Sequence, residues 1–387
     1  MKDTRLTQIE TWLLGVLGIT AIVGAYAYLY FTPLTLIRLV APLMLVLLLF
    51  LPKAEYDKPY FLTIAFYFLY TLHTVVMSVL YCEYISLIDV LNYVLGMSIV
   101  IATLTMTYSR PQAIFRFFYK FSLVALSLLI IFAWVERLAD WHLKGATCMQ
   151  VGYTGERLPC GFWANANDFA VVLTFFLLFM LAYAKNVLKK GRWFAALFFI
   201  ETFATLVMLK CRIAMSVTVL FAIYYYRDSL RRYLKIILPL LLLGGAALLV
   251  LFLTKGTSSG TVRLNLYEYA LLSVRDSYFL GFGAKMERVY YTWLNNATLF
   301  HNDINTHSFL FEMVISSGLF IFILYLLLLC FLEKKIGEKG KNEFYLLLPA
   351  YVILLFAPSS SVDLWFHYLF FAVAVGYIPF SKTATIK

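Results

Sequence analysis

Long apolar runs separated by short polar segments dominate this chain, and they decide its class before any motif is considered. A helix that crosses a bilayer needs roughly 20 mostly apolar residues. The runs lie at about 11–31, 34–51, 60–81, 85–107, 116–137, 165–184, 193–210, 212–226, 235–254, 306–332, 343–357 and 363–380. The sequence therefore predicts an all-α polytopic membrane protein, a single transmembrane domain over 1–387 with about twelve helices in a range of roughly 10 to 14.

Composition excludes a soluble fold. Hydrophobic residues make up 63% of the chain and charged residues only 14%, whereas a soluble domain carries about 25% charged residues. A net charge of +11 would suggest a nucleic-acid partner in a soluble protein. Here no phosphate-binding glycine loop or basic stripe accompanies the charge, and cytoplasmic loops of membrane proteins collect basic residues. We therefore expect a lipid bilayer, and no nucleic acid, as the surrounding partner.

The distribution of the basic residues predicts the orientation. With the N-terminus inside, most of the 32 lysines and arginines fall in inside segments, as the positive-inside rule requires. Both termini are then cytoplasmic, and two long loops, 138–164 and 255–305, lie outside. Cys148 and Cys160 share the first loop, where the sequence leaves open whether they are free thiols or form a disulfide.

The second outer loop contains an amphipathic segment. Its residues 263–278 (RLNLYEYALLSVRDSY) repeat apolar side chains at three- and four-residue steps. This spacing predicts a helix lying on the outer membrane surface or capping the bundle. The turn-like stretch Lys255–Thr261 precedes it, and the sequence YFLGFG at 278–283 ends it.

Three residues suggest a reaction. Arg212 lies between two apolar runs, Arg263 opens the amphipathic helix, and His307 begins the next span. Arginine binds phosphate oxygens bidentately and stays charged, and a histidine can remove a proton from a hydroxyl near neutral pH. The set suits attack of a sugar hydroxyl on a sugar linked to a lipid diphosphate. A diphosphate leaving group needs positive charge, and no Asp/Glu cluster indicates a metal, so we expect a metal-independent reaction without a cofactor.

Each candidate also has a simpler interpretation. Arg212 could be a cation that reaches the outer interface, and the loop residues could be ordinary hydrated groups. Further substrate-binding candidates are Arg275, Arg288, His301, Asn165, Asn167 and Asp168. The last three open a helix, where capping alone explains them. Glu201 is expected to pair with an arginine such as Arg38, and His73 and His367 are expected to be hydrogen-bonded interior residues.

Four segments resemble the O-antigen polymerase and O-antigen ligase superfamily of membrane glycosyltransferases. GFWANANDFA (161–170) resembles its Gly-Phe…Asn-x-Asn-x-x-Ala segment, and MLKCRIAMSV its Ser-Arg or Thr-Arg helix start. RLNLYEYALLSVRDSYFLGFG resembles its Arg-x-x-x-(Trp/Tyr)…Pro-x-x-Gly-x-Gly run, and THSFLFEMVISSGLF its His-(Asn/Ser)-x-x-Leu…Gly-Leu segment. Cys211 replaces the usual Ser and Tyr278 the usual Pro. The four segments follow the family's order between about 160 and 320.

The resemblance implies a function and a site. Arg212 and Arg263 would hold the diphosphate and His307 would activate the acceptor hydroxyl, with His301 as a competing base. The implied reaction polymerises undecaprenyl diphosphate-linked oligosaccharide repeats into a surface polysaccharide, such as O-antigen or capsule, at the periplasmic or extracellular face of the bacterial cytoplasmic membrane. Donor and acceptor glycans on the lipid carrier, a chain-length regulator and a flippase are the partners this implies.

Two alternatives remain. A ligase that transfers a finished glycan to an acceptor would share all four segments, so the sequence separates it poorly from a polymerase. A non-enzymatic transporter of lipid-linked glycans belongs to another class. The lack of internal repeats and the concentration of polar residues in one outer loop count against a transporter.

Overall fold

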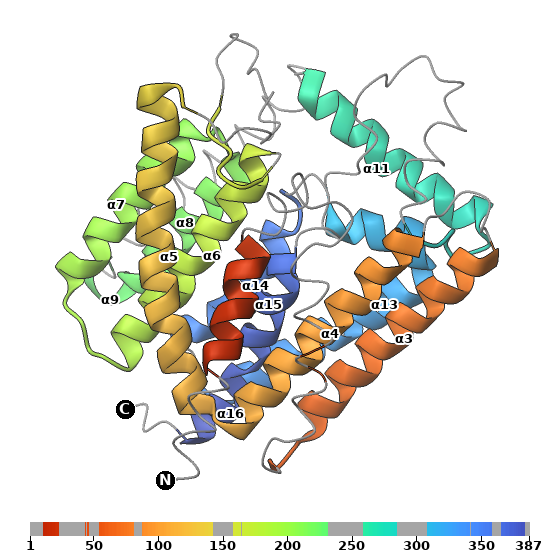
Figure 1. The fold of residues 1–387 in the computed structure, drawn as a ribbon, viewed down its shortest axis with the longest axis horizontal. Helices are drawn as coiled ribbons and strands as arrows, with labels where there is room; N and C mark the ends of the chain where they lie inside the picture. The colour runs from red at the N-terminus through yellow and green to blue at the C-terminus, as the bar shows by residue number, and fades with distance from the viewer. Residues whose placement is uncertain are drawn as a thin grey trace.

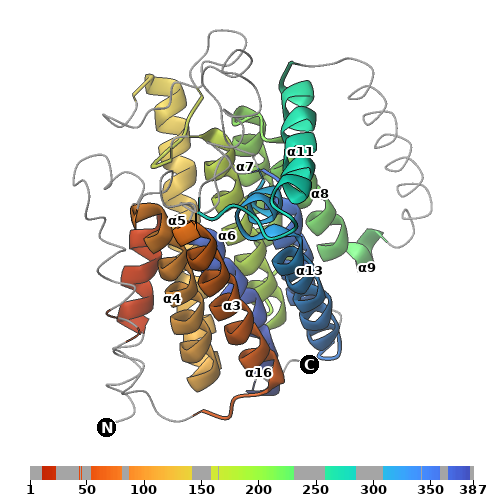
Figure 2. The same cartoon turned by 90° about the vertical axis from the view of Figure 1, so that its right-hand side faces the viewer.

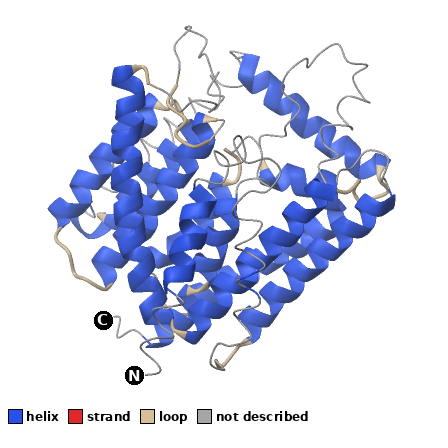
Figure 3. Ribbon diagram, viewed as in Figure 1, coloured by secondary structure: helices blue, strands red, loops and turns tan. Residues whose placement is uncertain are grey.

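The structure is a computed structural model. It describes residues 11–22, 43, 45, 54–80, 87–141, 158–163, 165–230, 258–284, 308–340, 342–357 and 365–383. Within these ranges the regular structure is entirely helical (Figure 3). After a helix at Thr11–Ile22, the elements are α3 (Lys58–Leu80), α4 (Leu87–Ser109), α5 (Pro111–Ala139), α6 (Ala166–Asn186), α7 (Arg192–Met208), α8 (Arg212–Tyr225), α9 (Arg227–Leu230), α11 (Ser258–Asp276), α13 (Phe309–Gly337), η2 (Glu343–Leu346), α14 (Leu347–Leu354), α15 (Trp365–Val375) and α16 (Tyr377–Thr383).

Five of the described helices are long and apolar enough to cross a membrane: α3, α4, α5, α6 and α13. The chain is therefore a membrane-embedded helical protein, as its hydropathy predicts. Most observed helices begin within a few residues of a predicted apolar run. The predicted run 363–380 instead forms two helices, α15 and α16, and residues 23–31 of the first run lie outside the described residues. The predicted runs 34–51 and 235–254 lie almost wholly outside the described residues, so the count of twelve spans and the orientation stay predictions.

The centre of the bundle is formed by α6 and α15. From Asp168 to Ala184 every side chain of α6 is buried, and the same holds for all of α15. Aromatic rings fill the space between helices: Phe175 stacks on Phe370 with centroids 3.4 Å apart, and Phe118 meets Phe179 edge-on at 4.7 Å. The surrounding helices bury one face only, since α3, α5 and α7 each carry exposed apolar side chains on the other.

The helices alternate in direction, which gives the bundle two ends (Figures 1 and 2). The start of α3 meets the end of α4 and α16 through Asp57, whose carboxylate accepts hydrogen bonds from Tyr108 and Lys382. Burial alone would raise the pKa of Asp57, but these two hydrogen bonds, the charge of Lys382 and the Tyr60 N–H together outweigh it and lower the pKa below its ordinary value. We refer to this end as the predicted inner end and to the opposite end, where α6 and α8 begin, as the predicted outer end.

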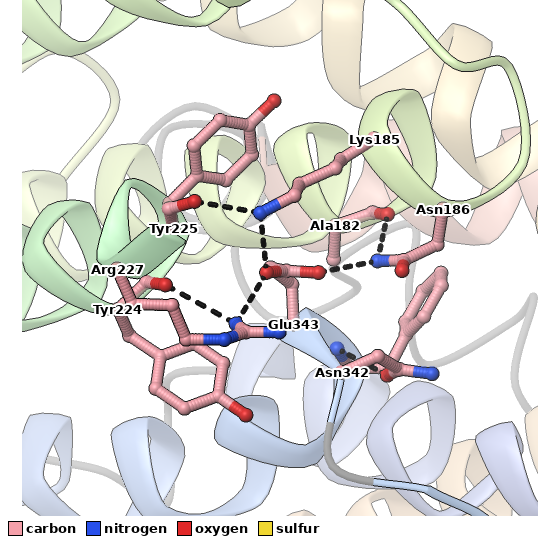
Figure 4. A network of polar contacts seen from close by, with 9 residues as sticks. Ala182, Lys185, Asn186, Tyr224, Tyr225, Arg227, Asn342 and Glu343 are labelled. Atoms are coloured by element: carbon pink, nitrogen blue, oxygen red, sulfur yellow. Dashed lines mark hydrogen bonds and ion pairs between the residues drawn. The ribbon is translucent and has the colours of Figure 1, made fainter. Parts of the chain in front are cut away.

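A buried carboxylate is the centre of a polar network that joins four elements at the predicted inner end (Figure 4). Glu343 of η2 is 1% exposed and accepts from Lys185 Nζ at 2.8 Å and from Arg227 Nη1 at 2.7 Å. Its second oxygen accepts from Asn186 Nδ2 at 2.9 Å. Lys185 also donates to the Tyr225 carbonyl at 2.6 Å, so the network joins α6, α8, α9 and η2.

We expect Glu343→Gln to destabilise the protein by about 2 kcal/mol, because two cations lose their shared carboxylate in a partly desolvated site. Thermal or denaturant unfolding in detergent measures this. Glu338→Gln is the matched control: Glu338 pairs with Lys335 in an exposed contact, where ion pairs contribute little, and its unfolding should match the wild type. Equal stability of the two variants would contradict the assignment.

Candidate functional site at the predicted outer end

A break in α13 organises the predicted outer end. Gly318 interrupts the helix with φ 77° and ψ 176°, which frees backbone groups that a continuous helix would pair. The segment 279–283 supplies their partners. Phe282 N–H donates to the Ile315 carbonyl at 2.8 Å, Gly283 N–H to the Ser316 carbonyl at 2.9 Å, and Leu319 N–H to the Phe279 carbonyl at 3.0 Å.

Glycine is required where these two backbones cross. A Cβ on Gly318 would lie 2.2 Å from the Phe279 carbonyl oxygen, and one on Gly281 would lie 2.4 Å from the Gly318 nitrogen. A Cβ on Gly283, which has φ 97°, would lie 2.8 Å from the Ser78 backbone. All three glycines adopt positive φ, which L-residues with side chains rarely do. The YFLGFG and SGLF sequences are therefore two halves of one packing contact, which we call the α13 crossing.

Helix α3 holds the α13 crossing through three polar side chains. His73 Nε2 lies 2.8 Å from the Leu280 carbonyl, which can only accept, so this nitrogen carries the proton. Thr74 Oγ1 lies 2.7 Å from Ser317 Oγ, and Ser78 Oγ accepts from Ala284 N–H at 2.9 Å. His73 is hydrogen-bonded as expected, but its side chain is partly exposed and not interior. Its role here is structural.

Helix α11 carries Arg263 toward the start of α13. Tyr267 stacks on Phe311 with centroids 4.2 Å apart, which packs α11 against the first turn of α13. Arg263 is one helical turn before Tyr267 on α11. The side chain of Arg263 lies outside the described residues, as does His307, which directly precedes the described N-cap residue Ser308.

The amphipathic helix differs in extent from its prediction. It begins at Ser258, so the expected turn over 255–261 is wrong for its last four residues, and it ends at Asp276. Arg275 projects from its last turn with a 74% exposed side chain and pairs with Asp276 at 2.8 Å. Arg288 and His301 lie outside the described residues.

The start of α6 is a second part of this end. Asn165 caps the helix, its Oδ1 accepting from Asn167 N–H at 2.8 Å, so the capping prediction is confirmed. Asp168 is buried in the first turn. The loop just before α6 is held by buried Glu136 of α5. Its carboxylate accepts from Cys160 N–H at 3.1 Å and from Gly161 N–H at 2.8 Å.

Cys160 forms a disulfide whose partner lies outside the described residues. Disulfides persist in oxidising compartments, which supports the predicted outer position of this end.

Arg212 begins α8 at the same end. Its side chain is exposed, and its carbonyl accepts from Ser216 Oγ at 2.9 Å. Buried Cys211 precedes it as N-cap residue without a capping side-chain bond. Helix α8 packs on α6, α7 and α14, whereas α11 packs on α13 (Figure 1). The structure thus brings the four predicted segments to one end of the bundle, with Arg212 and Arg263 on different helical groups.

Sequence reasoning missed the residues that support this end. Thr74 and Ser78 are small hydroxyl residues at a four-residue step on one face of α3, a periodicity that indicates a packed polar stripe. Glu136 is an acidic residue in the last turn of a long apolar helix. Such a position is unfavourable for a carboxylate, and that signal could have marked it as a ligand for backbone N–H groups.

These features define a polytopic helical membrane protein with a broken helix and a docked amphipathic helix at one end. The chain is similar to the teichuronic acid biosynthesis protein TuaE of Bacillus subtilis (strain 168), at 26% identity over 360 residues. The match covers 82% of this chain and 71% of the relative. No protein-family model matches the chain, and no solved structure matches it.

Proposed function

We propose that this protein is a metal-independent membrane glycosyltransferase. It polymerises undecaprenyl diphosphate-linked oligosaccharide repeats into a surface polysaccharide, at the outer face of the bacterial cytoplasmic membrane. The observation that carries this proposal is the packing of the Arg263 helix on the start of α13, directly after His307. Similarity along most of the chain to a protein named for teichuronic acid biosynthesis supports the substrate class.

In this proposal Arg212 and Arg263 neutralise the diphosphate as it departs. Guanidinium groups suit this role because they remain charged and offer paired N–H donors to phosphate oxygens. His307 takes the proton from the attacking sugar hydroxyl, the new glycosidic bond forms at the donor's anomeric carbon, and the carbon–oxygen bond to the diphosphate breaks. Charge on the leaving group is balanced by the arginines, so the step requires no metal.

The direct test uses purified protein in vesicles with a lipid-linked repeat unit as the sole substrate. A ladder of carrier-linked oligomers is the expected product. Consumption of preformed polymer together with a separate acceptor, and no ladder from single repeats, would instead identify a ligase. Translocation of the lipid-linked glycan without any new glycosidic bond would overturn the enzyme proposal.

Arg263→Lys is expected to reduce turnover by roughly tenfold or more, because a point charge replaces the bidentate contact to phosphate. Initial rates with the lipid-linked donor measure the effect. Arg137→Lys is the matched control at the same end of the bundle: Arg137 is an exposed residue in the last turn of α5 and is not a substrate-binding candidate, so activity should persist. If Arg263→Lys turned over substrate at the wild-type rate, Arg263 would have a structural role in the outer loop and would not bind the diphosphate.

A further inference from the structure

An apolar groove runs along the lipid-facing side of α5 and α7. It has a volume of about 640 Å³ and is lined by Ile131, Trp134 and Leu138 of α5 and by Phe198 of α7. One acidic residue, Glu201 of α7, also lines it. We call this the α5–α7 groove; the two helices lie side by side in Figure 1.

Glu201 occupies an unfavourable position for an acid. It lies nine residues after the start of α7 at Arg192, which at 1.5 Å per residue is about 13 Å along the helix. Glu201 therefore lies near the midpoint of this 17-residue helix. The side chain is exposed, and its neighbours Leu197 and Ile200 are 54% and 68% exposed.

Within the described part of the chain, the Glu201 carboxylate makes no hydrogen bond or ion pair; beyond the helix ladder, only its backbone carbonyl accepts a bond, from Thr205 Oγ1 at 2.9 Å. A carboxylate that faces lipid tails midway along an apolar helix is costly, and such residues normally face a partner or a water-filled cavity. The expected pair with Arg38 falls outside the described residues. The exposed carboxylate indicates that lipid chains alone do not cover this groove.

We propose that the α5–α7 groove binds a single transmembrane helix of another membrane protein, with a lysine or arginine near mid-span that pairs with Glu201. A helix is suited to the groove because it satisfies its own backbone in lipid and presents an apolar surface to Ile131 and Leu138. Its cation neutralises the carboxylate. A lipid tail would leave that charge uncompensated, and a symmetric second copy of this chain would bring a like charge to it. The proposal does not depend on the glycosyltransferase activity.

The test uses full-length protein in phosphatidylcholine vesicles with two synthetic spanning peptides of leucine and alanine. One peptide carries a central lysine and the other a central leucine. Energy transfer between labelled protein and labelled peptide measures association. We expect the lysine peptide to bind roughly 3- to 10-fold more tightly than the leucine peptide, and Glu201→Gln to remove this preference. Glu338→Gln, which changes an exposed carboxylate outside the spans, should keep it.

A second pair of variants separates shape from charge. Ile131→Trp fills the groove and should weaken both peptides, whereas Ile323→Trp changes an exposed residue of α13 that does not line the groove. If Glu201→Gln fails to fold, this pair alone carries the test. A preference that survives both Glu201→Gln and Ile131→Trp overturns the proposal.

Three further outcomes would also overturn it. The first is equal binding of the two peptides by the wild type. The second is self-association of the protein that Glu201→Gln abolishes, which would identify a second copy as the occupant. The third is a lysine preference that arises only after Arg38→Gln, which would show that the chain neutralises Glu201 itself.

Discussion

His307→Ala is expected to lower glycosyl transfer by about 10²- to 10⁴-fold, the usual contribution of a positioned general base. Folding and membrane insertion should be unaffected, because the packing of α13 begins beyond this residue: Phe309 N–H donates to the Leu355 carbonyl at 3.0 Å, and the Phe309 ring lies 4.6 Å from that of His367. Initial rates with a lipid-linked donor, together with thermal unfolding, separate loss of catalysis from loss of structure.

The matched control is His301→Ala, which removes the competing histidine of the same loop. If His307 is the base, His301→Ala should keep most of the activity. Wild-type activity should also decline at acidic pH, because a protonated imidazole cannot accept a proton. Near-normal turnover of His307→Ala with loss in His301→Ala would transfer the role to His301.

The sequence predicted the membrane-embedded helical class and most helix positions because both follow from hydropathy. A run such as 165–184 must be helical in lipid, where every backbone group has to be satisfied within its own segment. The observed helix covers Ala166–Asn186. Helix caps were equally local: Asn165 caps α6 because its own side chain reaches the N–H two residues on.

The long-range contacts were not predictable in the same way. The YFLGFG sequence indicated a break, and Gly318 was noted as part of a motif, but neither showed that the two segments pack on each other. That contact joins residues about 40 positions apart and depends on His73 and Ser78 of a third helix. Single-sequence patterns carry no information on such pairing, so the α13 crossing required the structure.

Glu201 shows another limit. Its position within an apolar run marked it as costly, and an internal arginine was the expected partner. In the structure, Glu201 is exposed in the α5–α7 groove on the surface of the bundle. An internal ion pair requires a buried carboxylate, whereas a partner at the surface requires an exposed one. Hydropathy cannot separate the two, because it does not show which face of α7 meets lipid.

Gly318→Ala is expected to destabilise the protein by about 3 kcal/mol or more and to remove most glycosyl transfer. The added Cβ would meet the Phe279 carbonyl oxygen at 2.2 Å and the Gly281 nitrogen at 2.7 Å, both backbone atoms that cannot rotate away. Alanine also favours continuation of α13 as a regular helix. The 279–283 segment would then lose its three hydrogen bonds to the break, and α11, which carries Arg263, would be held by its packing on the first turn of α13 without support at its C-terminal end.

Gly340→Ala separates this close approach from backbone strain. Gly340 also has a positive φ, 119°, but a Cβ there meets nothing within 4 Å. This variant should lose only about 1 kcal/mol, the cost of placing a side chain at positive φ, and should keep its activity. Unfolding in detergent and transfer rates measured on both variants decide the matter. If Gly318→Ala were no less stable than Gly340→Ala, the crossing would not hold the two halves of the site together, and Arg263 would have to be positioned by other contacts of α11, foremost the stacking of Tyr267 on Phe311.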